Sequence, residues 1–426
     1  MKKDTIQYII ITLFISIALP FCALAQNSSG TPYSMYGIGL QKDNYGPYSS
    51  LGGVSAGMRD NINLNFQNPA SYTALDSNRF YFQFGIDGEY VKISTTKESS
   101  DYRIAQNAAI NMGMRLFKNA YCSFGFNQRS STGYDLYYYN LIYGSYNEYY
   151  NKHVYGQGGL NDVYFGFGYK LGNLSLGANA SFIFGNIEKR LTLIPMIEDS
   201  YYISSQTKIS IRDVLFDIGL QYSWRLSPVS KLVVGTTFNF PTKLNADKNF
   251  ISYKANSSSN VQESIDEEEL NKGYINYPLK VTAGFSYDYK DRWLLAGDYT
   301  FQNMSKYREF RKEQGYNDYH KAAIGLSYLP ARLGRYWWQR NRYNVGFYGV
   351  RTHLEPDNKS TPINVFGATV GTQMSINIAN RELLLGVGFD FGIRGTEKEG
   401  LIREQYAKIR LNVAFKEGWF AKRKIY

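Results

Sequence analysis

Residues 173–184 read NLSLGANASFIF, and an apolar side chain stands at every second position from Leu174 to Phe184. The positions between them hold mainly serine, glycine and asparagine. Because successive side chains of a β-strand point to opposite faces, this stretch predicts a strand with one apolar face and one polar face. Residues 278–289 and 407–415 repeat the pattern, so the chain contains several strands that separate a polar phase from an apolar one.

Fourteen segments with this period can be placed along the chain. They are residues 79–93, 104–117, 120–130, 161–171, 174–187, 209–225, 230–240, 278–289, 292–303, 319–329, 342–352, 363–377, 382–393 and 403–415. An even number of antiparallel strands suits a closed bacterial barrel. A sheet in lipid has to close, because unpaired backbone groups in hydrocarbon are costly. We therefore predict an all-β fold, a 14-stranded antiparallel transmembrane β-barrel.

The connections between these segments alternate in length. Short turns are predicted at residues 118–119, 172–173, 227–228, 290–291 and 379–380, and long loops at 94–103, 131–160, 188–208, 241–277, 304–318, 353–362 and 394–402. Outer-membrane barrels have short periplasmic turns and long external loops. One connection on the short side, residues 330–341, is long. A soluble β-sandwich would also show period-two strands, but it offers no reason for the two loop lengths to alternate.

The composition favours a membrane barrel over the other membrane and soluble classes. The 426 residues include 39 Tyr and 26 Phe, and aromatic residues make up 16% of the chain. Barrels place such rings at both membrane interfaces. Beyond the N-terminal segment no apolar run approaches the 20 or so residues of a membrane helix. The formal net charge is +11. An exported protein does not meet nucleic acid, so we expect anionic lipid or an acidic partner instead.

Residues 1–25 have the features of a cleaved signal peptide. Lys2 and Lys3 precede an apolar run over 8–19, and Ala23 and Ala25 stand at the −3 and −1 positions of a cleavage site. A lipoprotein signal at Cys22 is disfavoured because the residue before it, Phe21, is large. Cleavage after residue 25 leaves Cys122 as the single cysteine, so the mature fold cannot depend on an internal disulfide.

Residues 26–78 precede the first predicted strand and show little alternation. A flexible external tail is one interpretation, and a plug folded into the barrel is the one we favour. Many inward positions on the strands are glycine, and glycine in a strand often marks a close approach of backbone. These positions are Gly166, Gly168, Gly177, Gly284, Gly386 and Gly388. The predicted division is therefore a signal peptide at 1–25, a hatch at 26–78, the barrel at 79–415 and a periplasmic tail at 416–426.

The run NINLNFQNPAS, residues 61–71, resembles the hatch region of the FadL/TodX family of long-chain fatty-acid and hydrocarbon transporters. Its core is Asn68-Pro69-Ala70, and the preceding segment 51–60 is also similar. The closing segment 417–424 resembles the end of FadL-like barrels. The resemblance implies an N-terminal hatch, fourteen strands and a hydrophobic substrate route. The inward positions here are polar or glycine, which departs from the apolar lining that such a route requires. In the wider family the same fold serves the shuttle barrel of type IX secretion and accessory barrels of outer-membrane machines.

Nothing in the sequence points to catalysis, a metal site or a cofactor. The three histidines, His153, His320 and His353, are scattered and form no ligand motif. An enzyme would need a base beside its nucleophile, and none is indicated. The acidic run 266–269 could attract a cation, but consecutive carboxylates do not converge by themselves, so a solvated acidic face is expected.

Two clusters of basic and aromatic residues are predicted on the periplasmic side. The first comprises Arg332, Arg335, Trp337, Trp338, Arg340 and Arg342, and the second Lys416, Trp419, Phe420, Lys422, Arg423 and Lys424. One interpretation is an interfacial anchor in which the rings meet the bilayer and the cations meet lipid phosphates. The other is a docking surface for a periplasmic or outer-membrane protein, because Trp and Arg are common hot-spot residues.

Two functional hypotheses follow for a non-enzymatic outer-membrane barrel with both mature termini in the periplasm. In the first, the barrel takes up small hydrophobic molecules past the hatch. In the second, it transports nothing and serves as a subunit of an outer-membrane secretion or barrel-assembly complex. An apolar internal pocket would favour uptake, whereas a closed polar lumen would favour the subunit.

Overall fold

The computed structural model describes residues 30–41, 46–142, 148–197, 200–256, 262–355, 361–378 and 381–418. The predicted signal peptide and the residues after 418 lie outside this part of the chain. The described strands form a single antiparallel sheet, and the pairing of the last strand, β19 (Arg403–Gly418), with β2 (Arg79–Ser94) closes it. The predicted closed barrel is thus confirmed. Among the described residues no helix has the length and apolar character needed to cross a membrane.

The remaining wall strands follow one another around the barrel. They are β3 (Ser99–Arg115), β4 (Ala120–Leu141), β5 (Tyr149–Leu171), β6 (Leu174–Pro195), β7 (Tyr201–Ser227), β8 (Ser230–Asn239), β9 (Thr242–Asn256), β10 (Gln262–Tyr277), β11 (Lys280–Tyr289), β12 (Trp293–Gln302), β15 (Tyr319–Tyr328), β16 (Arg342–Arg351), β17 (Asn364–Ile378) and β18 (Arg381–Gly395). Because β9 continues β8 and β11 continues β10, these elements make the fourteen predicted barrel strands.

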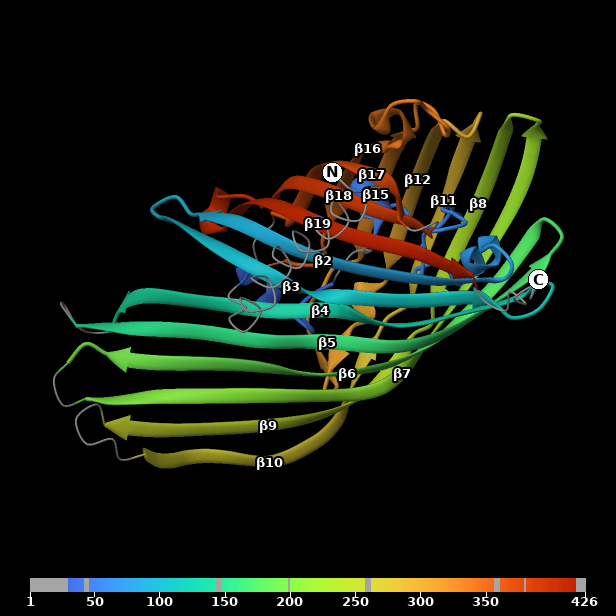
Figure 1. Ribbon diagram of the computed structural model, residues 1–426. Helices are drawn as coiled ribbons and strands as arrows, with labels where there is room; N and C mark the ends of the chain where they lie inside the picture. The colour runs from blue at the N-terminus through green and yellow to red at the C-terminus, as the bar shows by residue number, and fades with distance from the viewer. Residues whose placement is uncertain are drawn as a thin grey trace.

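Two prolines produce the breaks between β8 and β9 and between β10 and β11. Pro241 and Pro278 lie opposite each other, since Asn239 pairs with Lys280 and Thr242 with Tyr277. Proline has no N–H to give to a ladder, so the sheet bends where the two meet. Figure 1 shows the result: β9 and β10 run out with β4–β7 on one side, whereas β8, β11 and β12 turn away from them.

Three predicted long loops are wrong, because they consist largely of strand. Residues 131–160, 188–208 and 241–277 belong mainly to β4–β7, β9 and β10, which extend as long hairpins. The outer parts of these extensions lack a clean apolar face, so period two gives no signal there. The prediction that inward positions are polar or glycine also needs correction in this lobe. The inner face there carries a packed apolar cluster consisting of Ile38, Leu160, Ile183, Ile187, Ile209, Ile211, Leu215, Leu244, Ala246, Ile275, Tyr277, Met304 and Tyr307.

Burial along the wall strands is inverted relative to a water-soluble sheet. On β5 and β6 the exposed side chains include Phe165, Phe167 and Phe182, which are 57, 43 and 47% exposed. Asn179 and Ser181, on the opposite face of β6, are buried. An apolar outer surface around a polar interior is the arrangement that a membrane barrel requires.

The N-terminal segment lies inside the barrel. Its short helix η2 (Pro47–Leu51) packs against β15–β18, and η3 (Pro69–Ala74) packs against β4–β7. Both helices start at a proline in the first turn, where the missing N–H costs no hydrogen bond. We call residues 46–78 the hatch.

The wall is incompletely paired between β3 and β4. Their ladder runs only over Ile110–Arg115 and Tyr121–Phe126. At its end Asn111 Nδ2 donates to Asn127 Oδ1 at 3.2 Å, and further out the Tyr102 hydroxyl donates to the Asp135 carbonyl at 3.3 Å. The edge of β4 from residue 130 onward therefore has to find another partner.

Residues 30–41 supply that partner, and we call them the seal. Within the seal, β1 (Leu40–Gln41) pairs with residues 130–131 of β4, and Gly30 N donates to Gly133 O at 2.8 Å. The short helix η1 (Pro32–Met35) lies between, where Ser34 Oγ accepts from Gly133 N at 3.0 Å. The seal thus bonds to residues 130–133 of β4, part of the edge that β3 leaves unpaired.

Candidate functional site

The hatch is fixed to the wall by the predicted Asn68-Pro69-Ala70 motif. The Asn68 side chain accepts from Ala70 N at 3.1 Å, which caps η3, and donates to Ala56 O at 2.7 Å. The motif fits against the wall because two wall residues are glycine. A Cβ on Gly177 would lie 2.3 Å from the Pro69 carbonyl carbon, and one on Gly219 would lie 2.1 Å from Asn68 Oδ1. The motif seats η3 directly on the backbone of β6 and β7.

The inward glycines that the sequence singled out do not all behave alike. A Cβ on Gly166 would lie 2.6 Å from the Tyr72 ring, and one on Gly168 would lie 3.2 Å from Pro69 O, so close packing of the hatch is confirmed there and at Gly177. Gly284 instead makes room for the Asp298 side chain of the wall. At Gly386 and Gly388 the nearest atoms lie 3.5 Å away, and the space is ordinary.

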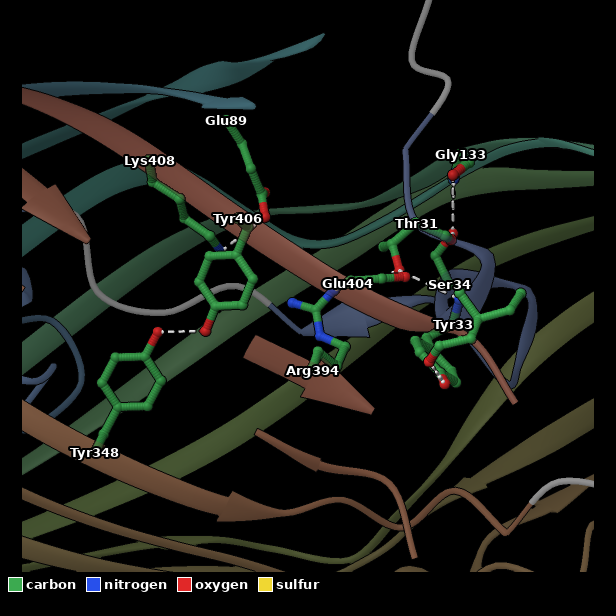
Figure 2. A network of polar contacts seen from close by, with 11 residues as sticks. Thr31, Tyr33, Ser34, Glu89, Gly133, Tyr348, Arg394, Glu404, Tyr406 and Lys408 are labelled. Atoms are coloured by element: carbon green, nitrogen blue, oxygen red, sulfur yellow. Dashed lines mark hydrogen bonds and ion pairs between the residues drawn. The ribbon is translucent and has the colours of Figure 1, made fainter. Parts of the chain in front are cut away.

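Ion pairs fill the lumen next to the seal (Figure 2). Arg394 Nη1 lies 2.6 Å from Glu404 Oε2, and both side chains are at most 8% exposed. Thr31 of the seal hydrogen-bonds to Glu404, and the Tyr33 hydroxyl donates to Ile402 O. The seal is therefore bonded to β4 on one side and to the strands β18 and β19 on the other.

The same network continues along the inner face of β19. Lys408 Nζ lies 3.5 Å from Glu89 Oε1, and the Tyr348 and Tyr406 hydroxyls are 2.6 Å apart (Figure 2). Each cation in this part of the lumen has its own carboxylate. Charges paired in this way hold the strands in register.

Arg129 of β4 lines a small interior cavity between the hatch, the seal and the wall. Its Nε lies 3.4 Å from Asp162 Oδ2, and its Nη2 lies 3.2 Å from Asp217 Oδ2. Both carboxylates are almost fully buried, with side chains 1 and 9% exposed. The cavity measures about 90 Å³. Ligand pockets usually measure roughly 300–1,000 Å³, so this space holds a few waters rather than a substrate.

A much larger space opens on the other side of the hatch, at the end of the barrel where the short turns lie. This vestibule has a volume of about 810 Å³. Its charged lining residues are Arg59, Asp60, Lys170, Lys231, Asp288, Asp291, Arg332, Arg340 and Arg342. Six cations and three carboxylates give it an excess of positive charge.

The structure divides the first predicted basic-aromatic cluster into two groups. Arg332, Arg340 and Arg342 line the vestibule. Trp337 and Trp338 belong to the short helix η5 (Trp337–Arg340) and are 66 and 46% exposed. The remaining member, Arg335, lies over the ring of Tyr336, which in turn stacks on Trp338. One connection thus presents cations to the lumen and aromatic rings to the outside.

The second predicted cluster is mostly beyond the described residues. Trp419, Phe420, Lys422, Arg423 and Lys424 lie outside them. Lys416 is described, and its Nζ lies 3.7 Å from Asp76 Oδ2 at the end of the hatch.

The histidines stay apart, and each has a structural partner. His153 Nε2 lies 2.7 Å from Asp135 Oδ1, and His320 Nδ1 lies 2.7 Å from the Tyr299 hydroxyl. Burial lowers the pKa of His353 to about 4, so this side chain is neutral near pH 7. The acidic residues 266–269 form part of the strand β10 rather than a loop. Among the described residues no group of three His, Cys, Asp or Glu side chains could hold a metal ion.

The sequence analysis missed Arg59, Lys170 and Lys231, although strand parity marks two of them. Lys170 shares its parity with the inward Gly166 and Gly168, and Lys231 shares its parity with the buried Val233. A cation at an inward position next to a short turn is therefore a readable signal. Arg59 carries no such mark, because the hatch has no regular period.

Solved structures with a similar fold are barrels with transport roles. The toluene transporter TbuX of Ralstonia pickettii aligns with a TM-score of 0.58 at 14% identity, covering 88% of this chain and 98% of that one. TodX of Pseudomonas putida, another toluene transporter, gives 0.56 at 14%, covering 89 and 99%. A FadL homologue of Pseudomonas aeruginosa gives 0.57 at 10%, covering 89 and 99%. Identities this low show a shared fold. No curated protein matched the sequence.

The closed barrel, its inner hatch and these neighbours define the class: the chain is a FadL-like barrel of the outer membrane. The family model BamG matches residues 5–426. The chain therefore belongs to the BamG family, a barrel family of outer-membrane machinery.

Proposed function

We propose that this protein is a non-transporting, non-enzymatic barrel subunit of an outer-membrane assembly machine. The observation that carries the proposal is the packed interior, in which the cavity around Arg129 measures about 90 Å³ and the seal is bonded to both neighbouring parts of the wall. Membership of the BamG family supports the same conclusion. In this role the barrel is a rigid support, and its surfaces carry the function.

The end with the short turns is the docking end in this proposal, and it faces the periplasm together with both mature termini. It carries the exposed pair Trp337 and Trp338 beside the charged vestibule. Exposed Trp and Arg residues are typical anchors of protein interfaces. Contact of the same rings with lipid head groups is the competing role, and the two predict different co-purifying molecules.

Uptake of a small hydrophobic molecule remains the second candidate. The fold is shared with toluene transporters, and the apolar cluster on β5–β10 is the specific feature that favours it. That cluster is packed by the seal residue Ile38 and by Tyr307, so a ligand would have to displace both.

The test is purification of the full-length protein at its native expression level in mild detergent, with mass spectrometry of the proteins and lipids that accompany it. A stable complex with other outer-membrane or periplasmic subunits and no bound apolar ligand supports the subunit role. A lone barrel with a stoichiometric apolar ligand would overturn it in favour of uptake.

A matched pair of variants locates the docking surface. The double substitution Trp337→Ala and Trp338→Ala is expected to release the partner. The control, Tyr139→Ala and Tyr149→Ala, removes two rings with the same exposures, 66 and 46%, from the opposite end of the barrel. Equal loss of the partner with both pairs, or with neither, would argue against docking at this end.

A further inference from the structure

The vestibule is open, large and unevenly charged, and its floor is the hatch. The hatch contributes Arg59, Asp60 and the segment 73–75, while Lys170 and Lys231 come from β5 and β8 of the wall. The connection 330–341 adds its inward arginines from the rim. Cations from three separate parts of the chain therefore converge on one space, which is a stronger sign of a site than a run of charges in sequence.

Arg59 belongs to the hatch, at the floor of the vestibule, and no carboxylate of the described residues forms an ion pair with it. Its three hydrogen bonds all leave from Nη1 and go to neutral acceptors: Ser175 Oγ at 3.0 Å, Gln221 Oε1 at 3.3 Å and Ala70 O at 3.4 Å. Within the described part of the chain it makes no ion pair. Burial lowers its pKa to about 10. The remaining N–H groups of the guanidinium are available to an acceptor in the vestibule.

The two wall lysines add to this charge instead of balancing it. Lys170 and Lys231 both lie within electrostatic range of Arg59, and Lys231 is also within range of Lys170. Neither lysine makes an ion pair with a described residue. Asp288 lies within range of Lys231, but three cations beside one carboxylate still repel one another, and an anion that enters among them relieves the repulsion.

Two of the three carboxylates of the vestibule accept hydrogen bonds from neighbouring groups. Asp60 accepts from Ile62 N at 2.8 Å and from Asn63 Nδ2 at 3.0 Å. Asp288 accepts from Asp291 N at 3.0 Å. These bonds fix the acids at the margins of the hatch and of a turn, and the lining keeps an excess of positive charge, with six cations against three carboxylates.

We propose that the vestibule binds a carboxylate-rich segment of a partner polypeptide. The inference rests on the proposed function, because it assigns to that docking end the chemistry of its partner. A single inorganic anion would satisfy one cation and leave the others, whereas a run of Asp and Glu side chains reaches several at once. The wall strands separate the space from the surrounding lipid. The volume, about 810 Å³, lies within the usual range of binding sites.

The test uses the full-length protein in detergent and a fluorescent hexaglutamate peptide, with hexaglutamine as the neutral peptide. Fluorescence anisotropy should show saturable, salt-sensitive binding of hexaglutamate alone. The double substitution Lys170→Gln and Lys231→Gln should raise the Kd about tenfold, as should Arg59→Gln. The control is Lys118→Gln with Lys290→Gln, which removes two exposed cations from short turns at the same end of the barrel. It should leave the Kd within about twofold, because neither residue lines the vestibule.

Each result has one meaning. An unchanged Kd in the lysine variant, which keeps every hatch bond, overturns the inference, and so does equal weakening by the control. Inorganic phosphate or phosphatidylglycerol that displaces the peptide at equal charge concentration also overturns it, in favour of a phosphate site. If the peptide fails to bind while the native complex still purifies, the vestibule inference fails and the proposed function stands. If the peptide binds but no native complex can be purified, the vestibule is an anion-binding site and the proposed function fails.

Discussion

Two arginines on either side of the hatch have opposite surroundings. Arg129 lies between two carboxylates, at 3.4 and 3.2 Å, and borders about 90 Å³ of space. Arg59 has three neutral acceptors and borders about 810 Å³. A buried cation that is paired with carboxylates adds little to the free-energy cost of burial and holds strands together. A buried cation without such partners favours the binding of an incoming anion. The difference separates the structural half of the lumen from the half that is available for binding.

The largest expected effect comes from removing the counter-charges of Arg129. Asp162→Asn with Asp217→Asn leaves a buried guanidinium without partners, which typically costs about 3–5 kcal/mol. Thermal unfolding in detergent, followed by the loss of heat-modifiable migration on gels, measures the change. Arg59→Gln is the matched control and should alter the stability by less than about 1 kcal/mol. Similar shifts in the two proteins would remove the contrast between the two arginines.

The second-largest effect is expected at the contact between the hatch and β6, which separates the vestibule from the cavity around Arg129. Gly177→Leu places a side chain where the Pro69 carbonyl carbon lies 2.3 Å from an ideal Cβ, so the hatch has to move. Overpacking of this kind costs about 1–3 kcal/mol. The neighbouring Ala178 is exposed on the outer face, and Ala178→Leu should be tolerated. Protease accessibility of the hatch, together with the unfolding temperature, reports the displacement. A stable Gly177→Leu protein with a protected hatch would show that the seat is not tight.

A smaller effect is expected from pH. The vestibule lining includes no histidine, so the affinity for hexaglutamate should be flat near neutral pH. Arg59 binds an anion only in its protonated form, and its pKa is about 10, so affinity should fall as the pH rises through that value. The Lys170→Gln and Lys231→Gln variant isolates the contribution of Arg59, because it removes the two lysines of the vestibule that would titrate in the same pH range. Affinity in this variant that stays constant up to about pH 11 would show that Arg59 keeps its proton there and that burial does not lower its pKa as expected.

The smallest effect tests how the connection 330–341 is divided. Arg340→Gln removes an inward cation of the rim and should weaken hexaglutamate binding by about two- to threefold. Arg335→Gln removes an arginine that lies over Tyr336 outside the vestibule and should change nothing measurable. The same anisotropy titration decides the matter, and a stronger loss with Arg335→Gln would reverse the assignment of the two arginines.

Strand period carried most of the fold prediction, and it failed where its physical cause is absent. The stretch around Leu174 and Phe184 crosses the membrane, so lipid on one side and polar lumen on the other impose alternation. The outer parts of β9 and β10 do not separate those phases. Pro241 and Pro278, at the base of these two strands, favour a loop in the sequence, although the chain only bends there and continues as strand.

The sequence predicts only part of the candidate site, because it shows residues that are clustered along the chain and not residues that the fold brings together. Arg332, Arg340 and Arg342 stood out because they are dense in sequence, while Lys170 and Lys231 are single residues that only the closed barrel brings together. The alternation of side chains along β5 and β8 could have placed the two lysines on the inner face of the barrel. Nothing in the sequence indicates that Arg59 lacks a counter-charge, because that depends on which side chains surround it in three dimensions.

The seal has a consequence for how the protein folds. The Tyr33 hydroxyl and its acceptor, the Ile402 carbonyl, are separated by 369 positions in sequence. The seal emerges early in synthesis and β4 follows soon after it, but the part of its binding place formed by β18 and β19 exists only once those strands have been made. Contacts at such separation form late, because the loop entropy has to be overcome before they contribute. The seal therefore gains its full set of bonds only at the last step of assembly, and until then another strand can compete with it for the β4 edge.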